Sequence, residues 1–207
     1  MLHPLRTLRW RRGNHDTGAT MNRFHNILCR SGIWRRTLER EIFPWVFEDV
    51  QLGDEMLEIG PGPGLTTDLL RFRVKKLTAV EIDARLAASL ARRLAGTNVT
   101  VLQQDSTALQ IPDASFDGAI CLTMLHHVPS PALQDTLLHE VARVLRPGSL
   151  FIGCDLLFRS RFDLMHLFDT KVPVDPEGFP ARLGSAGFSD IHIDTRRHAF
   201  RFHARRI

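Results

Sequence analysis

The sequence predicts an α/β fold, a single doubly wound and mostly parallel sheet with helices on both faces. Short apolar runs alternate with helical patterns from residue 55 onward, which is typical of a parallel sheet covered on both sides. A glycine-rich turn at 60–64 joins the first of these runs to a helical segment. Two alternating runs, 191–195 and 200–204, predict a closing antiparallel hairpin with its turn at 196–199.

Hydrophobic periodicity places the other elements. We expect strands near 55–60, 76–81, 98–103, 116–122 and 149–154, and helices near 65–73, 84–95 and 131–145. Ser130 is a good N-cap for the third helix, and Arg146-Pro-Gly148 should end it. The expected buried stripe of that helix is Leu133, Leu137, Val141 and Val144.

The segments outside this core are less regular. Residues 1–20 are rich in Arg, and we expect them to be disordered, or translated ahead of a start at Met21, rather than a targeting segment. Residues 21–50 show helical periodicity, which Pro44 should break or kink. Residues 51–207 form the main domain, in which Asp175 should begin a short helix toward Ala186.

Composition excludes several classes of protein. The 207 residues are 43% hydrophobic and 24% charged, and no apolar run approaches a membrane span. Three cysteines without a CxxC pair indicate neither a disulfide framework nor a metal site, which favours the cytoplasm. The net charge of +4 comes from Arg concentrated at both ends of the chain. These arginines could form a patch for nucleic acid or an acidic substrate. No nucleic-acid recognition motif accompanies them, so we expect them to be solvated.

Acidic residues near the glycine turn narrow the choice of ligand. The turn alone would serve a dinucleotide, a nucleotide or S-adenosylmethionine. Glu81 and Asp105 end the second and third expected strands, where carboxylates can accept from a ribose and from an adenine amino group. Glu58 precedes the turn, and Leu65 stands where a dinucleotide fingerprint has its third glycine. Three carboxylates suit a cationic cofactor without phosphate, whereas Asp83 is expected to cap a helix.

With these motifs, residues 55–151 resemble the class I, seven-strand S-adenosylmethionine-dependent methyltransferases. The matches are Leu-Glu-Ile-Gly-Pro-Gly-Pro-Gly, Val-Glu-Ile-Asp, Gln-Asp-Ser, Phe-Asp-Gly-Ala-Ile-Cys-Leu-Thr and Val-Leu-Arg-Pro-Gly, with Ser149 departing from the usual glycine. The resemblance implies a seven-stranded sheet ordered 3-2-1-4-5-7-6 with strand 7 antiparallel, and a lid from residues 24–47. It also implies S-adenosylmethionine contacts at Glu58, Gly60, Pro61, Gly62, Gly64, Glu81, Ile82, Asp105, Ser106 and Thr123.

The acceptor side of the site is less determined. Methyl transfer is an in-line displacement that depends on orientation, and a base helps only where the acceptor must lose a proton. His126 and His127 follow the fourth strand, and either could be that catalytic base or a packed loop histidine. Thr123 and Asp155 end the fourth and fifth strands and could line the same cleft.

The segment 121–128 also bears on the class of acceptor. Ribosomal RNA adenine dimethyltransferases share the first three motifs, but carry Asn-x-Pro-aromatic where this chain reads Cys-Leu-Thr-Met-Leu-His-His-Val. The His-His-Val element is more similar to methyltransferases of small molecules and quinone biosynthesis. We therefore expect a small-molecule or lipid-like acceptor. The alternatives are an RNA methyltransferase and a non-catalytic S-adenosylmethionine-binding protein.

Overall fold

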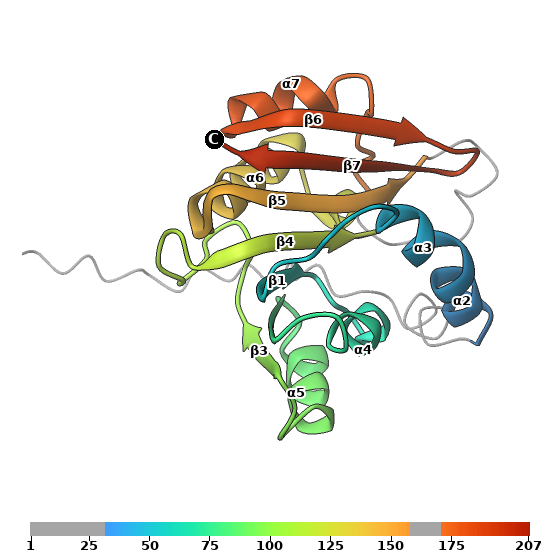
Figure 1. Cartoon of the computed structure of the whole chain (residues 1–207), viewed down its shortest axis with the longest axis vertical. Coiled ribbons are helices and arrows are strands. Elements are labelled where there is room, and N and C mark those ends of the chain that lie inside the picture. The colour runs from blue at the N-terminus through green and yellow to red at the C-terminus, as the bar shows by residue number, and fades with distance from the viewer. Residues whose placement is uncertain (1–31, 158–170) are drawn as a thin grey trace, which may run out of the picture.

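The computed structural model describes residues 32–157 and 171–207. Within them, seven strands form one sheet in the order β3-β2-β1-β4-β5-β7-β6 (Figure 1). Neighbours among β1 to β5 are parallel, and β7 runs antiparallel to both β5 and β6. The predicted fold class, strand order and antiparallel seventh strand are confirmed. The expected leader, residues 1–20, lies outside the described residues.

The elements have the following bounds. The strands are β1 Glu55–Ile59, β2 Lys76–Glu81, β3 Val99–Gln103, β4 Phe116–Leu122, β5 Leu145–Leu156, β6 Phe188–Thr195 and β7 Ala199–Arg206. The α-helices are α2 Gly32–Thr37, α3 Phe43–Val46, α4 Leu65–Leu70, α5 Ala84–Arg93, α6 Pro131–Val144 and α7 Phe179–Ser185. A π-helix, η1 Leu38–Ile42, and a 3-10 turn, η2 Leu125–His127, complete the set.

Helices pack on both faces of the sheet. On one face, α6 and α7 contribute to a core that contains Phe151, Phe200 and Phe202, all fully buried. On the other face, α3 and α4 pack in a second core with Ile120 and Ile152, and α5 packs beside them on β2. The central strands β1 and β4 are buried on both sides, which explains why their sequences are near-continuous apolar runs.

The order of the strands fixes where a ligand can bind. The chain runs outward from β1 to β2 and β3, and then returns to place β4 against the opposite side of β1. This reversal makes the carboxyl ends of β1 and β4 a topological switch point, the position at which open α/β sheets bind ligands. The glycine turn follows β1 directly, so the sequence places it at this switch point.

Three local expectations are wrong. The last helix begins at Phe179, because Asp175 accepts hydrogen bonds from the backbone of Glu177 and Gly178 and holds a turn there. Strand β5 begins at Leu145 and contains the Arg-Pro-Gly segment, where its register against β4 shifts. Leu133 is 39% exposed.

The buried position in the first turn of α6 belongs to Gln134, next to Leu133. The Gln134 amide donates to the carbonyls of Leu125 and Val172 at 3.0 and 2.9 Å, which satisfies two backbone acceptors. Ser130 caps the same helix as predicted, because its hydroxyl accepts from the backbone N–H of Leu133 at 3.2 Å. The helix therefore starts where expected, with a different face of its first turn buried.

The helices before β1 tolerate Pro44 by changing type. Phe43 N–H donates to Leu38 O, five residues back, so the chain passes through a π-turn. Pro44 then lies in the first turn of α3, which continues directly from the π-turn. Trp45 is 4% exposed, and its Nε1 donates to Asp194 at 3.1 Å, so this aromatic residue is part of the core.

We expect Phe202→Ala to lower the free energy of unfolding by about 3–5 kcal/mol, because it opens a cavity between Phe151 and Phe179. The matched control is Phe72→Ala, whose side chain is 76% exposed and should change stability by less than about 0.5 kcal/mol. Urea titrations measure the free energy of unfolding of both variants. An equal loss of stability in the two variants would contradict the burial of Phe202 in the core.

Candidate functional site

The glycine turn lies at the carboxyl end of β1. Gly60 N donates to Val80 O at 2.9 Å, which ties the start of the turn to β2. Gly60 has a φ of +64°, and a Cβ there would lie 2.2 Å from Met124 Cγ. At Gly64, φ is +85° and a Cβ would lie 2.3 Å from Leu90. Both positions therefore require glycine, which keeps the backbone open to a ligand.

Glu81 connects this turn to the end of β2. Its Oε2 accepts from Gly62 N, and its Oε1 accepts from Asp83 N, both at 2.9 Å. The residue is 5% exposed, and burial raises the pKa of its carboxyl group. Each carboxylate oxygen has a second lone pair, so Glu81 can hold the loop and still accept from a ligand hydroxyl.

Glu58 lies beneath the same turn. The side chain is 3% exposed, and its two oxygens accept from the hydroxyls of Thr66 and Thr67 in the first turn of α4. Burial, assisted by the negative charges of Asp68 and Glu81, raises the pKa of Glu58 to about 7, although the two hydroxyl hydrogen bonds act in the opposite direction. A cation above the turn would favour the ionised form.

The second edge of the site follows β2 and β3. Ile82 is 53% exposed directly after Glu81. Asp105 follows β3, and its Oδ1 accepts from the backbone N–H and the hydroxyl of Thr107, both at 2.8 Å. Asp105 therefore holds a local turn, and its contact with a ligand stays a prediction, as does that of Ser106. Asp83 caps α5 through hydrogen bonds from two backbone N–H groups.

The fourth strand ends in a strained residue. Thr123 has a φ of +50°, a conformation that is unfavourable for a β-branched side chain and costs on the order of 1–3 kcal/mol. Its N–H donates to Cys154 O at 2.8 Å, which fixes the bend against β5. The bend brings Met124 against Gly60. Strain of this kind is concentrated at ligand sites, which supports a functional role for this bend.

The two histidines after the bend differ in environment. His126 is 1% exposed, and its Nδ1 lies 2.5 Å from Asp155 Oδ1. His127 is half-buried, and the two rings are 4.0 Å apart between centroids. The sequence placed Asp155 at the end of the fifth strand but did not predict its partner. The available signal was that β4 and β5 are neighbouring parallel strands whose carboxyl ends meet.

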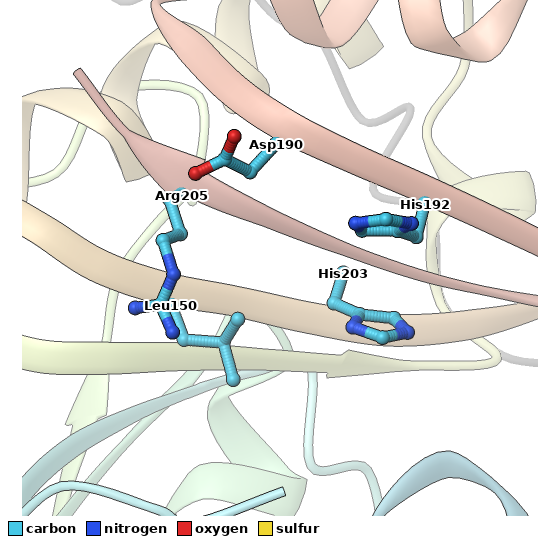
Figure 2. A pocket seen from close by; sticks show the side chains of 5 residues that line it. All are labelled: Leu150, Asp190, His192, His203 and Arg205. Carbon is cyan, nitrogen blue, oxygen red and sulfur yellow. The ribbon is translucent and has the colours of Figure 1, made fainter.

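A separate hollow lies on the sheet near β6. It is lined by Leu150, Asp190, His192, His203 and Arg205, and Figure 2 shows the two imidazole rings on neighbouring strands. Leu150 precedes Asp155 by five residues on β5, which is about 17 Å along a strand. The lining residue His203 pairs with Ile152, three residues before Asp155, so along β5 the hollow ends about 10 Å short of Asp155. Within 32–157 and 171–207, no group of three or more His, Cys, Asp or Glu is arranged to hold a metal.

Within residues 32–157 and 171–207, no helix has the length and apolar character that crossing a membrane requires.

The arginines near the end of the chain make contacts within the fold. Arg201 pairs with Asp194 and Glu48 at 3.1 and 3.2 Å, and Arg206 donates to Ala142 O at 2.7 Å. Arg196 lies over the ring of Trp45, 4.6 Å from its centroid.

Comparison with known proteins identifies the central region. Residues 57–153 match the family described as "Methyltransferase domain". The chain is 32% identical over 109 residues to a ubiquinone biosynthesis O-methyltransferase of Azotobacter vinelandii, covering 50% of this chain and 45% of that protein. It is 34% identical over 159 residues to ribosomal RNA small subunit methyltransferase A of Leptothrix cholodnii, covering 67% and 57%. The chain thus spans about half the length of these relatives.

A solved structure agrees with the fold. An S-adenosylmethionine-dependent methyltransferase from Aquifex aeolicus superposes with a TM-score of 0.64 at 19% identity, over 83% of this chain and 93% of that chain. At this level of identity the similarity concerns the fold.

The environment of Glu58 makes stability depend on pH. Since its pKa rises from 4.5 to about 7 on folding, the folded chain binds more protons than the unfolded chain between these pH values. The free energy of unfolding should fall as pH rises through that window, by up to about 3 kcal/mol. Glu58→Gln should remove this loss, so urea titrations from about pH 5 to about pH 8 should increasingly favour the variant.

The control is Glu140→Gln. Hydrogen bonding to Arg143 lowers the pKa of Glu140 below 4.5, so its contribution changes only at lower pH and should be constant across the same range. A pH dependence for Glu58→Gln that runs parallel to that of the wild type would contradict the assignment.

Proposed function

Because this chain belongs to the class I, Rossmann-like S-adenosylmethionine-dependent methyltransferases, we propose that it transfers a methyl group from S-adenosylmethionine to a small-molecule or lipid-like acceptor. The observation that carries the proposal is the pair of buried carboxylates at the glycine turn. Glu58 and Glu81 are 3% and 5% exposed, and both lie where the turn meets α4 and β2. Burial raises the pKa of both carboxyl groups. A cationic ligand would favour their ionised forms, whereas a pyrophosphate would oppose ionisation.

The residues present fit this cofactor. The open backbone at Gly60, Gly62 and Gly64 would approach the methionine end, with Pro61 and Glu58 supporting it, while Glu81 would accept from the ribose hydroxyls. Ile82, Asp105 and Ser106 would surround the adenine, and Thr123 would border the site from β4. When bound, the cofactor supplies a methyl group made electrophilic by its sulfonium sulfur.

The work of the protein is mainly to orient the reactants. Holding the acceptor in line with the methyl group can supply roughly 7–11 kcal/mol of barrier lowering without acid or base. His126 and His127 lie after the end of β4, where the acceptor would bind. Either histidine would act as a base only for an acceptor that loses a proton.

The acceptor class is inferred from the acceptor-side sequence. The His-His-Val segment and the relative that carries the name of a quinone-biosynthesis O-methyltransferase favour a phenol or similar small molecule. We place the enzyme in the cytoplasm, a proposal supported by the free thiols of Cys121 and Cys154.

RNA is the second candidate acceptor. The match to ribosomal RNA small subunit methyltransferase A, over 159 residues, is the observation that favours it. Against it, Arg196, Arg201 and Arg206 make contacts within the fold, which reduces their availability to a phosphate backbone. A cofactor-binding protein without turnover is the third alternative, and methyl transfer to any acceptor would exclude it.

The cofactor assignment predicts a thermal shift. S-adenosylhomocysteine at a hundred times its dissociation constant should add about 2.7 kcal/mol of stability, which corresponds to roughly 5–11 °C in Tm for a chain of this size. Glu81→Ala should lose most of the shift. Glu81→Gln, which keeps an acceptor oxygen for the turn, separates loss of charge from loss of loop structure.

The matched control is Glu177→Ala, an exposed acid in the turn before α7, which should retain the full shift. Nicotinamide adenine dinucleotide at the same concentration should leave Tm unchanged. Stabilisation by the dinucleotide alone would overturn the cofactor assignment.

Binding to RNA separates the two acceptor classes. For a small-molecule enzyme we expect only weak binding to a ribosomal RNA fragment in filter-binding assays, with no methyl incorporation. An RNA enzyme would bind tightly at low salt, lose affinity steeply as salt rises, and incorporate methyl groups. The second result would replace the small-molecule proposal.

A further inference from the structure

Asp155 is a buried carboxylate whose partners all lie at the carboxyl edge of the sheet. It is 0% exposed at the end of β5. Its Oδ1 lies 2.5 Å from His126 Nδ1 and 2.7 Å from Leu156 N, and its Oδ2 accepts from the backbone N–H of His126 at 3.0 Å. The carboxylate therefore contacts both the backbone N–H and the side-chain Nδ1 of His126.

This arrangement determines which ring nitrogen carries the proton. An ionised carboxylate only accepts hydrogen bonds, so His126 Nδ1 must donate to it. In the neutral imidazole, the lone pair is then on Nε2. A carboxylate in this position also stabilises the imidazolium that forms when Nε2 takes up a proton, as the acid of a catalytic triad does.

We propose that Asp155 is a positioning residue that holds His126 with its proton on Nδ1, so that Nε2 receives the proton lost by the methyl acceptor. The inference rests on the proposed function. As the acceptor O–H bond breaks, the proton moves to Nε2, and the electron pair left on oxygen forms the new bond to the methyl carbon. The carbon–sulfur bond breaks with its electrons remaining on sulfur, and His126 later releases the proton to solvent.

Neighbouring contacts hold His126 in place independently of the ring. Val172 N donates to His126 O at 2.8 Å, and the Gln134 amide donates to the carbonyls of Leu125 and Val172. With Asp155, these contacts restrain η2 from β5, from α6 and from the segment before α7. His126 is 1% exposed, so water has little access to the ring, and an acceptor reaches Nε2 only by displacing the atoms that cover it.

The first test measures the tautomer directly in the full chain. Nitrogen-15 NMR of histidine-labelled protein, with and without S-adenosylhomocysteine, should show His126 protonated on Nδ1. In Asp155→Asn, the side-chain amide can donate to Nδ1, so the proton should shift to Nε2. The control is Asp194→Asn on β6, which alters a carboxylate that accepts a hydrogen bond from Trp45 of α3 and pairs with Arg201 of β7. It should leave the His126 signals unchanged.

The second test measures turnover with catechol as the probe acceptor. Asp155→Asn should lower kcat by about 10²- to 10⁴-fold, while the thermal shift with S-adenosylhomocysteine and the KM for the donor stay within about twofold. Asp194→Asn should keep wild-type kcat. If Asp155→Asn fails to fold, His126→Asn serves instead, because its amide can reproduce the Nδ1 donor toward Asp155 but has no nitrogen equivalent to Nε2.

The outcomes separate this inference from the proposed function. A wild-type His126 with its proton on Nε2, or a folded Asp155→Asn variant with unchanged kcat, would overturn the role of Asp155. A wild-type protein that neither responds to S-adenosylhomocysteine nor methylates catechol would instead contradict the cofactor and the phenolic acceptor, while the NMR measurement would still decide the tautomer.

Discussion

The contact between Gly60 and Met124 is the constraint on which the candidate site depends. A Cβ at residue 60 would lie 2.2 Å from Met124 Cγ, so the turn after β1 and the bend after β4 fit together only with glycine there. The left-handed conformation of Thr123 produces the bend, and its hydrogen bond to Cys154 O fixes the bend against β5. The ends of β1, β4 and β5 therefore contact one another at the switch point.

Local signals in the sequence account for most of the fold. Ser130 and Asp83 cap their helices as expected, because each needs only an N–H two or three residues away. The glycine spacing and the acids at the strand ends indicate the carboxyl edge of the sheet, because these signals also lie within a few residues of the strand ends that they mark. The predictions for Leu133 and Asp175 are wrong because other contacts determine these positions. The first turn of α6 buries Gln134 instead of Leu133, and the Asp175 side chain stabilises a turn instead of starting a helix.

The pairings within the site could not be read from the sequence. Glu58 could be placed near the turn, yet its burial beneath the first turn of α4, against Thr66 and Thr67, follows from how that helix packs. His126 and Asp155 are 29 residues apart, and they meet only because β4 and β5 pair in parallel register. Periodicity assigns residues to strands, but the depth at which a side chain is buried depends on contacts between elements distant in sequence.

The ionisation of the buried acids at this edge depends on whether a cation is bound there. Burying a carboxylate is unfavourable unless hydrogen bonds or opposite charges compensate it. Asp155 accepts from the backbone N–H groups of His126 and Leu156. At Glu81 and Glu58 the effect of burial exceeds that of the hydrogen bonds, so the pKa of Glu81 is raised and that of Glu58 rises to about 7. A bound cation would supply the missing compensation and shift Glu58 toward its ionised form. In the proposed reaction, Glu58, which lowers stability near neutral pH, would therefore favour a cationic donor over a neutral product.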